Sequence, residues 1–194
     1  METIVATRAR RRGPATGAQT WIALLRGINV VGRNKVPMPA LAAALERARF
    51  RSVRTYIQSG NVIFQSAAGT ARTLGRRIAQ LVLREFGFTP EVMVITAAEL
   101  ARAVRGNPFP GAHRDHKSLH IFFLAATPTE PDLESLAKLD AGREAFALKG
   151  DVFYLYTPDG FADSVLRPRI ERCLGVPATG RNWRTANQLL KMLD

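Results

Sequence analysis

The sequence predicts an α+β fold built from two ferredoxin-like subdomains, each with an antiparallel sheet. Residues 20–105 show apolar alternation and helical periodicity in the order β-α-β-β-α-β, which is the split β-α-β arrangement. Residues 118–194 open with the same succession, β-α-β-β-α. Residues 106–117, rich in glycine, proline and histidine, have the composition of a linker between the two halves.

The N-terminal half is expected to form a four-stranded sheet covered by two helices on one face. Pro39 suits the first turn of a helix, and Gly87 is a good helix end. Thr96 and Glu99 have the spacing of a capping box at the start of a short helix. The expected elements are strands at 20–26, 53–58, 61–65 and 92–95, and helices at 39–49, 70–86 and from residue 96 onward.

The C-terminal half is interpreted as a second copy of the same plan, with its final strand replaced or displaced. Gly150 and Asp151 lie between two short apolar runs and predict a hairpin. The expected elements are strands at 119–124, 145–149 and 152–156, and helices at 132–139, about 165–174 and about 183–193.

The charge of the chain favours anionic partners. The 194 residues carry a formal net charge of +12. A tail at residues 1–19, with four arginines against Glu2 and no apolar periodicity, is expected to be disordered. Removing that tail still leaves a net charge of +9 on residues 20–194, so the folded body is basic in its own right. Nucleic acid and phosphorylated small molecules are the expected partner classes.

The composition of the chain also bears on its cellular location. The longest apolar run, residues 119–126, is far shorter than the roughly 20 residues of a membrane helix. We therefore expect a cytoplasmic protein without a membrane partner. The single cysteine, Cys173, cannot form an internal disulfide, and its helical flanks favour a packed thiol.

Five segments together resemble a known family. They are ALLRGIN, NKVPM, YIQSGNVIF, NPFP and RNW-x-T, which begin at Ala23, Asn34, Tyr56, Asn107 and Arg181. The chain resembles the bacterial family catalogued as domain of unknown function 1697, from about Trp21 to the C-terminus. The resemblance implies two ferredoxin-like subdomains in one compact protein, and it implies no established activity. The chain departs from the family pattern at Val31, where relatives carry glycine, and at Val165, where they carry lysine.

The first candidate site is the loop that follows the first strand. It leaves a buried strand and enters a helix, a geometry in which backbone N–H groups can hold an anion. A P-loop is excluded because Arg33 and Asn34, rather than lysine and a hydroxyl residue, follow the second glycine. The alternative is that the asparagines only shape a tight connection. The candidate ligand-binding residues are Arg26, Gly27, Asn29, Gly32, Asn34 and Lys35, and Arg33 adds charge.

Two further segments are candidates. Gln58, Ser59 and Asn61 lie at a predicted hairpin tip, where amide and hydroxyl groups can face a ligand, although turn chemistry alone also selects such residues. Trp183 follows Arg181 and Asn182, so its indole could stack on a base or a sugar. The alternative is that Asn182 caps a helix whose indole packs on the core.

Metal and cofactor chemistry is not predicted. His113 and His116 lie in the linker and His120 on a strand, and no carboxylate arrangement completes a recognised metal site around them. No nucleophile elbow or dinucleotide fingerprint is present, so neither a cofactor nor a metal is expected.

Three functional hypotheses remain open. The first is a binding protein that holds an anionic ligand through the loop after the first strand. The second is an uncatalogued enzyme with a polar cleft between the two subdomains, lined by residues such as Arg26, Asn34 and Arg181. The third is a structural or partner-binding protein.

Overall fold

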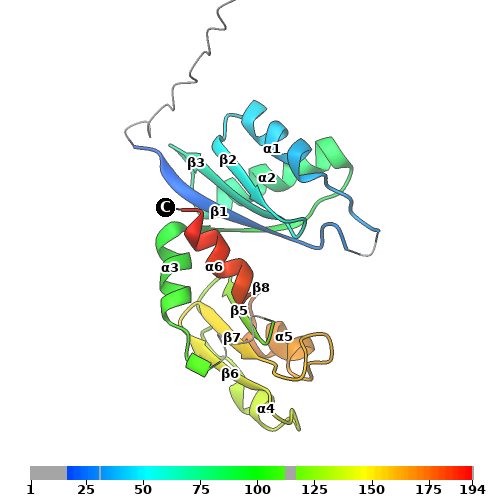
Figure 1. Cartoon of the computed structure of the whole chain (residues 1–194), viewed down its shortest axis with the longest axis vertical. Coiled ribbons are helices and arrows are strands. Elements are labelled where there is room, and N and C mark those ends of the chain that lie inside the picture. The colour runs from blue at the N-terminus through cyan, green and yellow to red at the C-terminus, as the bar shows by residue number, and fades with distance from the viewer. Residues whose placement is uncertain (1–16, 31, 112–116, 194) are drawn as a thin grey trace, which may run out of the picture.

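The computed structural model describes residues 17–30, 32–111 and 117–193, and it contains two four-stranded antiparallel sheets (Figure 1). The predicted α+β class with two ferredoxin-like sheets is confirmed. The predicted tail, Val31 and the linker histidines His113 and His116 lie wholly or largely outside the described residues. No helix in the described ranges is long and apolar enough to cross a membrane.

The first sheet has the strand order β2-β3-β1-β4, so β4 is an edge strand. Two helices cover one face, and the core between them and the sheet includes Leu25, Phe64 and Ile78. The capping box of Thr96 and Glu99 is present as expected at the start of a third helix. The elements are β1 (Gln19–Arg26), α1 (Met38–Arg47), β2 (Arg51–Tyr56), β3 (Asn61–Ser66), α2 (Ala71–Phe86), β4 (Glu91–Thr96) and α3 (Ala97–Arg105).

The second sheet repeats this order as β6-β7-β5-β8. Two short helices, α4 and α5, pack on its outer face around Phe122, Phe153 and Ile170. The elements are β5 (Leu119–Leu124), α4 (Leu133–Ala137), β6 (Ala145–Lys149), β7 (Val152–Tyr156), the 3-10 turn η2 (Arg167–Arg169), α5 (Ile170–Leu174), β8 (Ala178–Asn182) and α6 (Trp183–Lys191).

The interpretation that the final strand of the second copy is replaced or displaced was wrong. Residues 178–182 form β8, which pairs antiparallel with β5. The segment reads ATGRN, which lacks apolar alternation because Thr179 and Arg181 are the side chains that point into the interior. Both are buried, and tertiary contacts satisfy the buried guanidinium. A strand whose inward side chains are polar gives no hydrophobic signal in the sequence.

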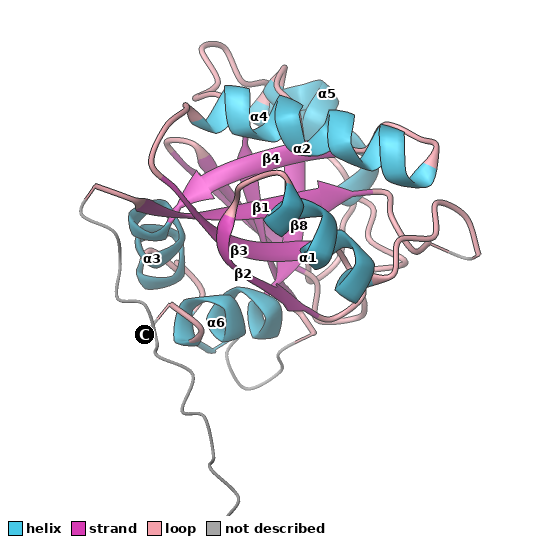
Figure 2. Ribbon diagram, turned by 90° about the horizontal axis from the view of Figure 1, so that it is seen from above, coloured by secondary structure: helices cyan, strands magenta, loops and turns pink. Residues whose placement is uncertain are grey.

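The inner faces of the two sheets share a third core. Because side chains alternate along a strand, β1 sends Ile22 and Leu24 to the face opposite its helices. Phe123 and Tyr154 of the second sheet reach the same core, which α3 and α6 complete. Figures 1 and 2 show α3 and α6 side by side where the two subdomains meet. The two halves are therefore held together by a continuous apolar interior.

Candidate functional site

The loop after β1 is closed on itself by its two asparagines. Asn29 donates its side-chain N–H to the carbonyls of Val36 and Gln58, and its oxygen accepts the Val36 N–H at 2.8 Å. Asn34 donates to the Gly27 carbonyl at 2.9 Å. Both asparagines have positive φ, of 54° and 52°, a conformation that asparagine tolerates better than most residues. The loop's amides thus shape the backbone and tie it to the β2–β3 turn.

Arg26 is engaged by carboxylates. Its guanidinium contacts Glu171 on α5 at 2.6 Å and Glu91 on β4 at 3.1 Å. The hydrogen bond from Arg26 lowers the pKa of Glu171 below its usual value. Arg26 therefore joins the two subdomains, and an anionic ligand would have to displace two carboxylates to reach it. Gly32, Arg33 and Lys35 remain exposed at the loop tip.

Arg181 connects the second candidate segment to the third. The residue is 9% exposed, and its guanidinium donates to Asn61 Oδ1 at 2.6 Å and to the Leu25 carbonyl at 2.9 Å. It also donates to the carbonyls of Ser59 and Gly60. Desolvation lowers the pKa of Arg181 to about 10, which still leaves the group charged at neutral pH. This buried cation fastens β8 to the β2–β3 turn.

Asn182 and Trp183 have structural contacts. The Asn182 side chain accepts the Thr185 N–H at 2.8 Å and so caps α6. Trp183 is partly buried against the core between the subdomains. The three predicted segments do converge, because Asn29 meets Gln58 and Arg181 meets Asn61. Their polar groups are largely satisfied by one another, and none of them lines the groove between β4 and the second subdomain.

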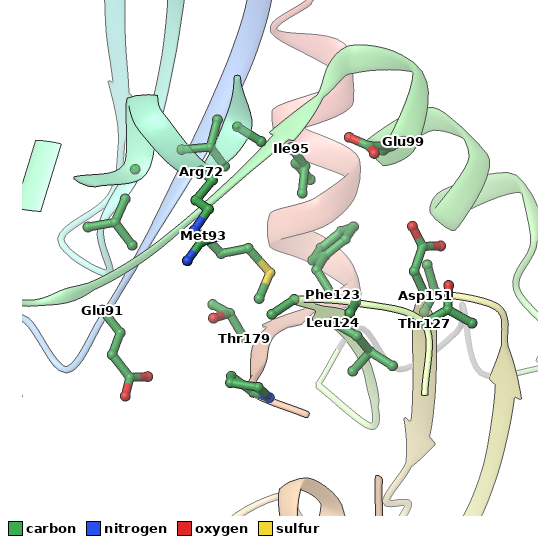
Figure 3. Close-up of a pocket in the computed structure, with 18 of the residues that line it drawn as sticks. Arg72, Glu91, Met93, Ile95, Glu99, Phe123, Leu124, Thr127, Asp151 and Thr179 are labelled. Carbon is green, nitrogen blue, oxygen red and sulfur yellow. The ribbon is translucent and has the colours of Figure 1, made fainter. Parts of the chain in front are cut away.

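A groove lies elsewhere, between the edge strand β4 and the second subdomain, and sequence reasoning did not find it. Its volume is about 890 Å³, and both subdomains line it (Figure 3). This volume falls within the roughly 300–1,000 Å³ typical of ligand pockets. Figure 3 shows the Met93 side chain between Arg72 on one side and Phe123 and Thr179 on the other. A smaller cavity of about 260 Å³ lies beside α4 in the second subdomain.

One wall of the groove is α2, which carries two arginines, Arg72 and Arg76. Arg72 and Arg76 are four residues apart and therefore share a helix face. Both are exposed, and neither makes an ion pair with the residues that the structure describes. Gly75 between them lets the helix approach β4, since an added Cβ would lie 2.8 Å from the Val92 carbonyl oxygen.

The other charged groups around the groove are already engaged. Arg102 donates to both oxygens of Asp151, each at 2.9 Å. Glu99 accepts the Thr96 N–H as the partner in the capping box. The unpaired charge of the groove is therefore positive and concentrated on α2. The sequence contains one signal of this close packing, which is a glycine inside a strong helical pattern with arginines at i−3 and i+1. Glycine in a helix interior disfavours the helix, so its presence there indicates that another element packs closely against it.

The opposite wall and floor are apolar. Met93 and Ile95 of β4 face the second subdomain, where Phe123 and Leu124 of β5 and Pro177 complete the lining. The arrangement therefore offers guanidinium donors on one side and an apolar surface on the other.

His120 is a buried histidine rather than a ligand in an assembled site. The residue is 8% exposed, and its ring stacks on Phe161 with centroids 3.7 Å apart. Its Nδ1 has no hydrogen-bond partner among the described residues. Burial, with a smaller contribution from the Arg167 charge, lowers the pKa of His120 to about 4. No group of three or more His, Cys, Asp or Glu side chains in the described ranges could hold a metal.

The family departure at Val165 falls on an exposed position. Val165 is 43% exposed and donates its backbone N–H to Glu144. The side chain at this position therefore does not contribute to either the groove or the converged segments.

Comparisons with known proteins identify the fold and the family. The chain is similar in structure to the conserved bacterial protein SP0830 from Streptococcus pneumoniae, with a TM-score of 0.63 and 21% sequence identity. The match covers 91% of this chain and 99% of that one. No curated protein matches the sequence. The sequence profile of the family described as protein of unknown function (DUF1697) matches residues 18–154, so this chain belongs to the DUF1697 family.

Proposed function

We propose that this protein binds an anionic ligand in the groove between its subdomains, with Arg72 and Arg76 as the anion-binding pair. The observation that carries the proposal is the presence, on the wall of an 890 Å³ cavity, of two guanidinium groups that form no ion pair with any other described residue. Guanidinium groups match carboxylate and phosphate oxygens with paired N–H donors. The apolar lining favours a ligand that also has an apolar part.

This proposal keeps the anionic ligand expected from the sequence and changes its location. In the loop after β1, Arg26 is paired with two carboxylates and the asparagines bond the backbone. The exposed loop-tip cations, Arg33 and Lys35, remain a competing surface, and nucleic acid is the partner that such a surface would suit. The two locations can be compared directly, because each carries two cations.

A thermal-shift screen of phosphorylated and carboxylated metabolites tests the proposal. Three proteins are compared: wild type, Arg72→Gln/Arg76→Gln, and the charge-matched control Arg33→Gln/Lys35→Gln. A ligand at 100 times its Kd should stabilise the fold by about 2.7 kcal/mol, or roughly 5–10 °C in Tm. We expect this shift in wild type and in the loop variant, and its loss in the groove variant.

The opposite pattern would place the site in the loop. Loss of the shift only in Arg33→Gln/Lys35→Gln contradicts the groove proposal. A single-stranded oligonucleotide is tested in parallel over a range of salt concentrations. Steeply salt-dependent binding that both double variants weaken equally indicates nucleic-acid contact spread over the basic surface, and it also contradicts the proposal.

A further inference from the structure

The groove contains an unpaired strand edge. Among the residues that the structure describes, β4 has a hydrogen-bonded strand on one side only, β1, and its residues Glu91 to Ile95 line the groove. An open strand edge is a template for another strand, and folded proteins usually cover or interrupt such edges. This edge is sheltered inside a concave site that has room for a ligand.

The hydrogen-bond pattern of β1 identifies which groups of β4 point into the groove. Leu25 donates its N–H to the Gly60 carbonyl on the β3 side, and its own carbonyl accepts from Arg181. Leu25 pairs in register with Val92. In an antiparallel ladder, such a pair does not exchange hydrogen bonds, so the Val92 N–H and C=O point away from β1. By alternation, those of Val94 also point outward.

The next outward residue supports this assignment. The Thr96 N–H is not used by β1 and instead donates to Glu99 Oε2 at 2.6 Å. No described side chain or loop plays that part for Val92 or Val94. The Val92 carbonyl oxygen packs against Gly75 of α2, where an added Cβ would lie 2.8 Å from it. The Val92 N–H and the N–H and C=O of Val94 have no hydrogen-bond partner among the described residues and face the groove.

The two faces of β4 differ in chemistry. Val92 and Val94 belong to the core under α2, so a strand added beside them would have Arg72 and Arg76 on that same face. Met93 and Ile95 belong to the core between the subdomains, where Phe123 and Leu124 form the apolar wall. An added strand would therefore meet cations on one face and apolar surface on the other.

We propose that the ligand of this groove is an extended peptide that adds to β4 as a fifth strand, with acidic and apolar side chains alternating along it. This inference rests on the proposed function and names its ligand class. Strand addition draws affinity from main-chain hydrogen bonds and specificity from alternate side chains. The acidic side chains contact Arg72 and Arg76, and the apolar side chains contact the wall formed by the second subdomain.

The spacing of the two arginines suits such a peptide. Side chains at i and i+2 of a strand are about 6.8 Å apart, and helix positions i and i+4 are about 6 Å apart along the axis. Two successive acidic residues on one face of the peptide therefore match Arg72 and Arg76. A free phosphate or a single carboxylate would use only part of this arrangement.

Charge disfavours two other occupants of the edge. Antiparallel pairing of β4 with β4 of a second copy would bring the Arg72 and Arg76 pairs of both copies to the same face of the joined sheet. The basic tail of the chain, with four arginines and one glutamate in residues 1–19, has the same sign as these arginines. Like charges at such a contact oppose association.

The test is fluorescence anisotropy with the labelled peptide Val-Glu-Val-Glu-Val-Glu-Val. The control peptide has the same composition in blocks, Glu-Glu-Glu-Val-Val-Val-Val. We expect saturable binding of the alternating peptide only, and about tenfold weaker binding to Arg72→Gln/Arg76→Gln. The charge-matched variant Arg33→Gln/Lys35→Gln should bind like wild type. Equal binding of the two peptides overturns the proposal.

Backbone methylation distinguishes strand addition from simple charge attraction. Two versions of the peptide carry N-methyl groups, on every glutamate or on every valine. An antiparallel added strand directs a glutamate N–H to the Val94 carbonyl, so methylation of the glutamates alone should abolish binding. In a parallel strand, methylation of the valines alone should do so. Binding that survives both methylations, or is abolished by both, overturns the proposal.

A protein variant tests the same edge from the other side. Val92→Pro removes an outward N–H without breaking the hydrogen bonds between β4 and β1. It should weaken binding of the alternating peptide, while circular dichroism shows that the fold is retained. If this variant does not fold, the methylated peptides decide the question.

The outcomes also separate this inference from the proposed function. If a metabolite binds only when Arg72 and Arg76 are present and neither peptide binds, the peptide proposal is overturned and the proposed function stands. A concentration-dependent dimer that Val92→Pro dissociates assigns the edge to a second copy and overturns the peptide as well.

Discussion

The buried His120 makes the stability of this protein depend on pH in a way that can be isolated. The folded state holds the ring neutral, with a pKa of about 4, whereas the usual value is 6.5. The unfolded chain therefore takes up a proton at a higher pH than the folded chain does. Stability from this group is complete above pH 6.5 and is lost as the pH falls toward 4.

The size of the effect follows from the difference between the two pKa values. Integrating proton uptake between a folded pKa of about 4 and an unfolded pKa of 6.5 gives a loss of about 2 kcal/mol at pH 5 and about 3 kcal/mol at pH 4. The cause is burial of His120, a residue that is 8% exposed, and the charge of Arg167 adds to it. A charged ring there would have the Arg167 cation near it, and no carboxylate of the described residues forms an ion pair with it.

The assay is urea unfolding at pH 7.5, 6, 5 and 4 of wild type and His120→Phe, which keeps an aromatic ring against Phe161. Carboxylates titrate in both proteins, so their contribution cancels in the difference between the two. We expect the stability of wild type relative to the variant to fall by about 2 kcal/mol between pH 7.5 and 5. Parallel pH profiles, or an NMR titration of His120 with a pKa near 6.5, would refute the reasoning.

Two further predictions concern the contacts around β8. Arg181→Met should cost about 2–4 kcal/mol in urea unfolding, because Asn61 Oδ1 and several carbonyls lose a buried charged donor, and Arg181→Lys should recover only part of that loss. A stability of Arg181→Met equal to that of wild type would show that these contacts do not stabilise the fold. Gly180→Ala should cost about 1–3 kcal/mol, since its Cβ would lie 2.8 Å from the Phe122 ring, whereas the open-space control Gly111→Ala should be nearly neutral in the same assay.

Local signals explain why most elements could be predicted. The run at 20–26, the helical stripe of α2 and the capping box of Thr96 depend on neighbours in the sequence, and all three are present in the structure. The sequence also indicates the loop after the first strand, and one of its two interpretations is that the asparagines shape a tight connection. The hydrogen bonds of Asn29 and Asn34 to backbone carbonyls agree with that interpretation.

What the sequence could not reveal depends on contacts between distant residues. β8 has polar inward side chains because Arg181 reaches the Leu25 carbonyl and Asn61, 120 positions or more away in the chain. In the sequence, Arg26 has no carboxylate near it, but the fold places Glu91 and Glu171 within ion-pair distance of its guanidinium. The groove exists only because α2, β4 and the second subdomain come together. Gly75 indicates in the sequence that α2 packs closely on another element, but it does not identify that element.

The sequence by itself determined the fold class, the order of most elements and the positive charge, since these follow from local periodicity and composition. Only the tertiary structure decided which cations are free. Pairing depends on distances of about 3 Å between residues that are far apart in the chain. The fold brings partners to Arg26 and Arg181, whereas Arg72 and Arg76 stay unpaired among the described residues.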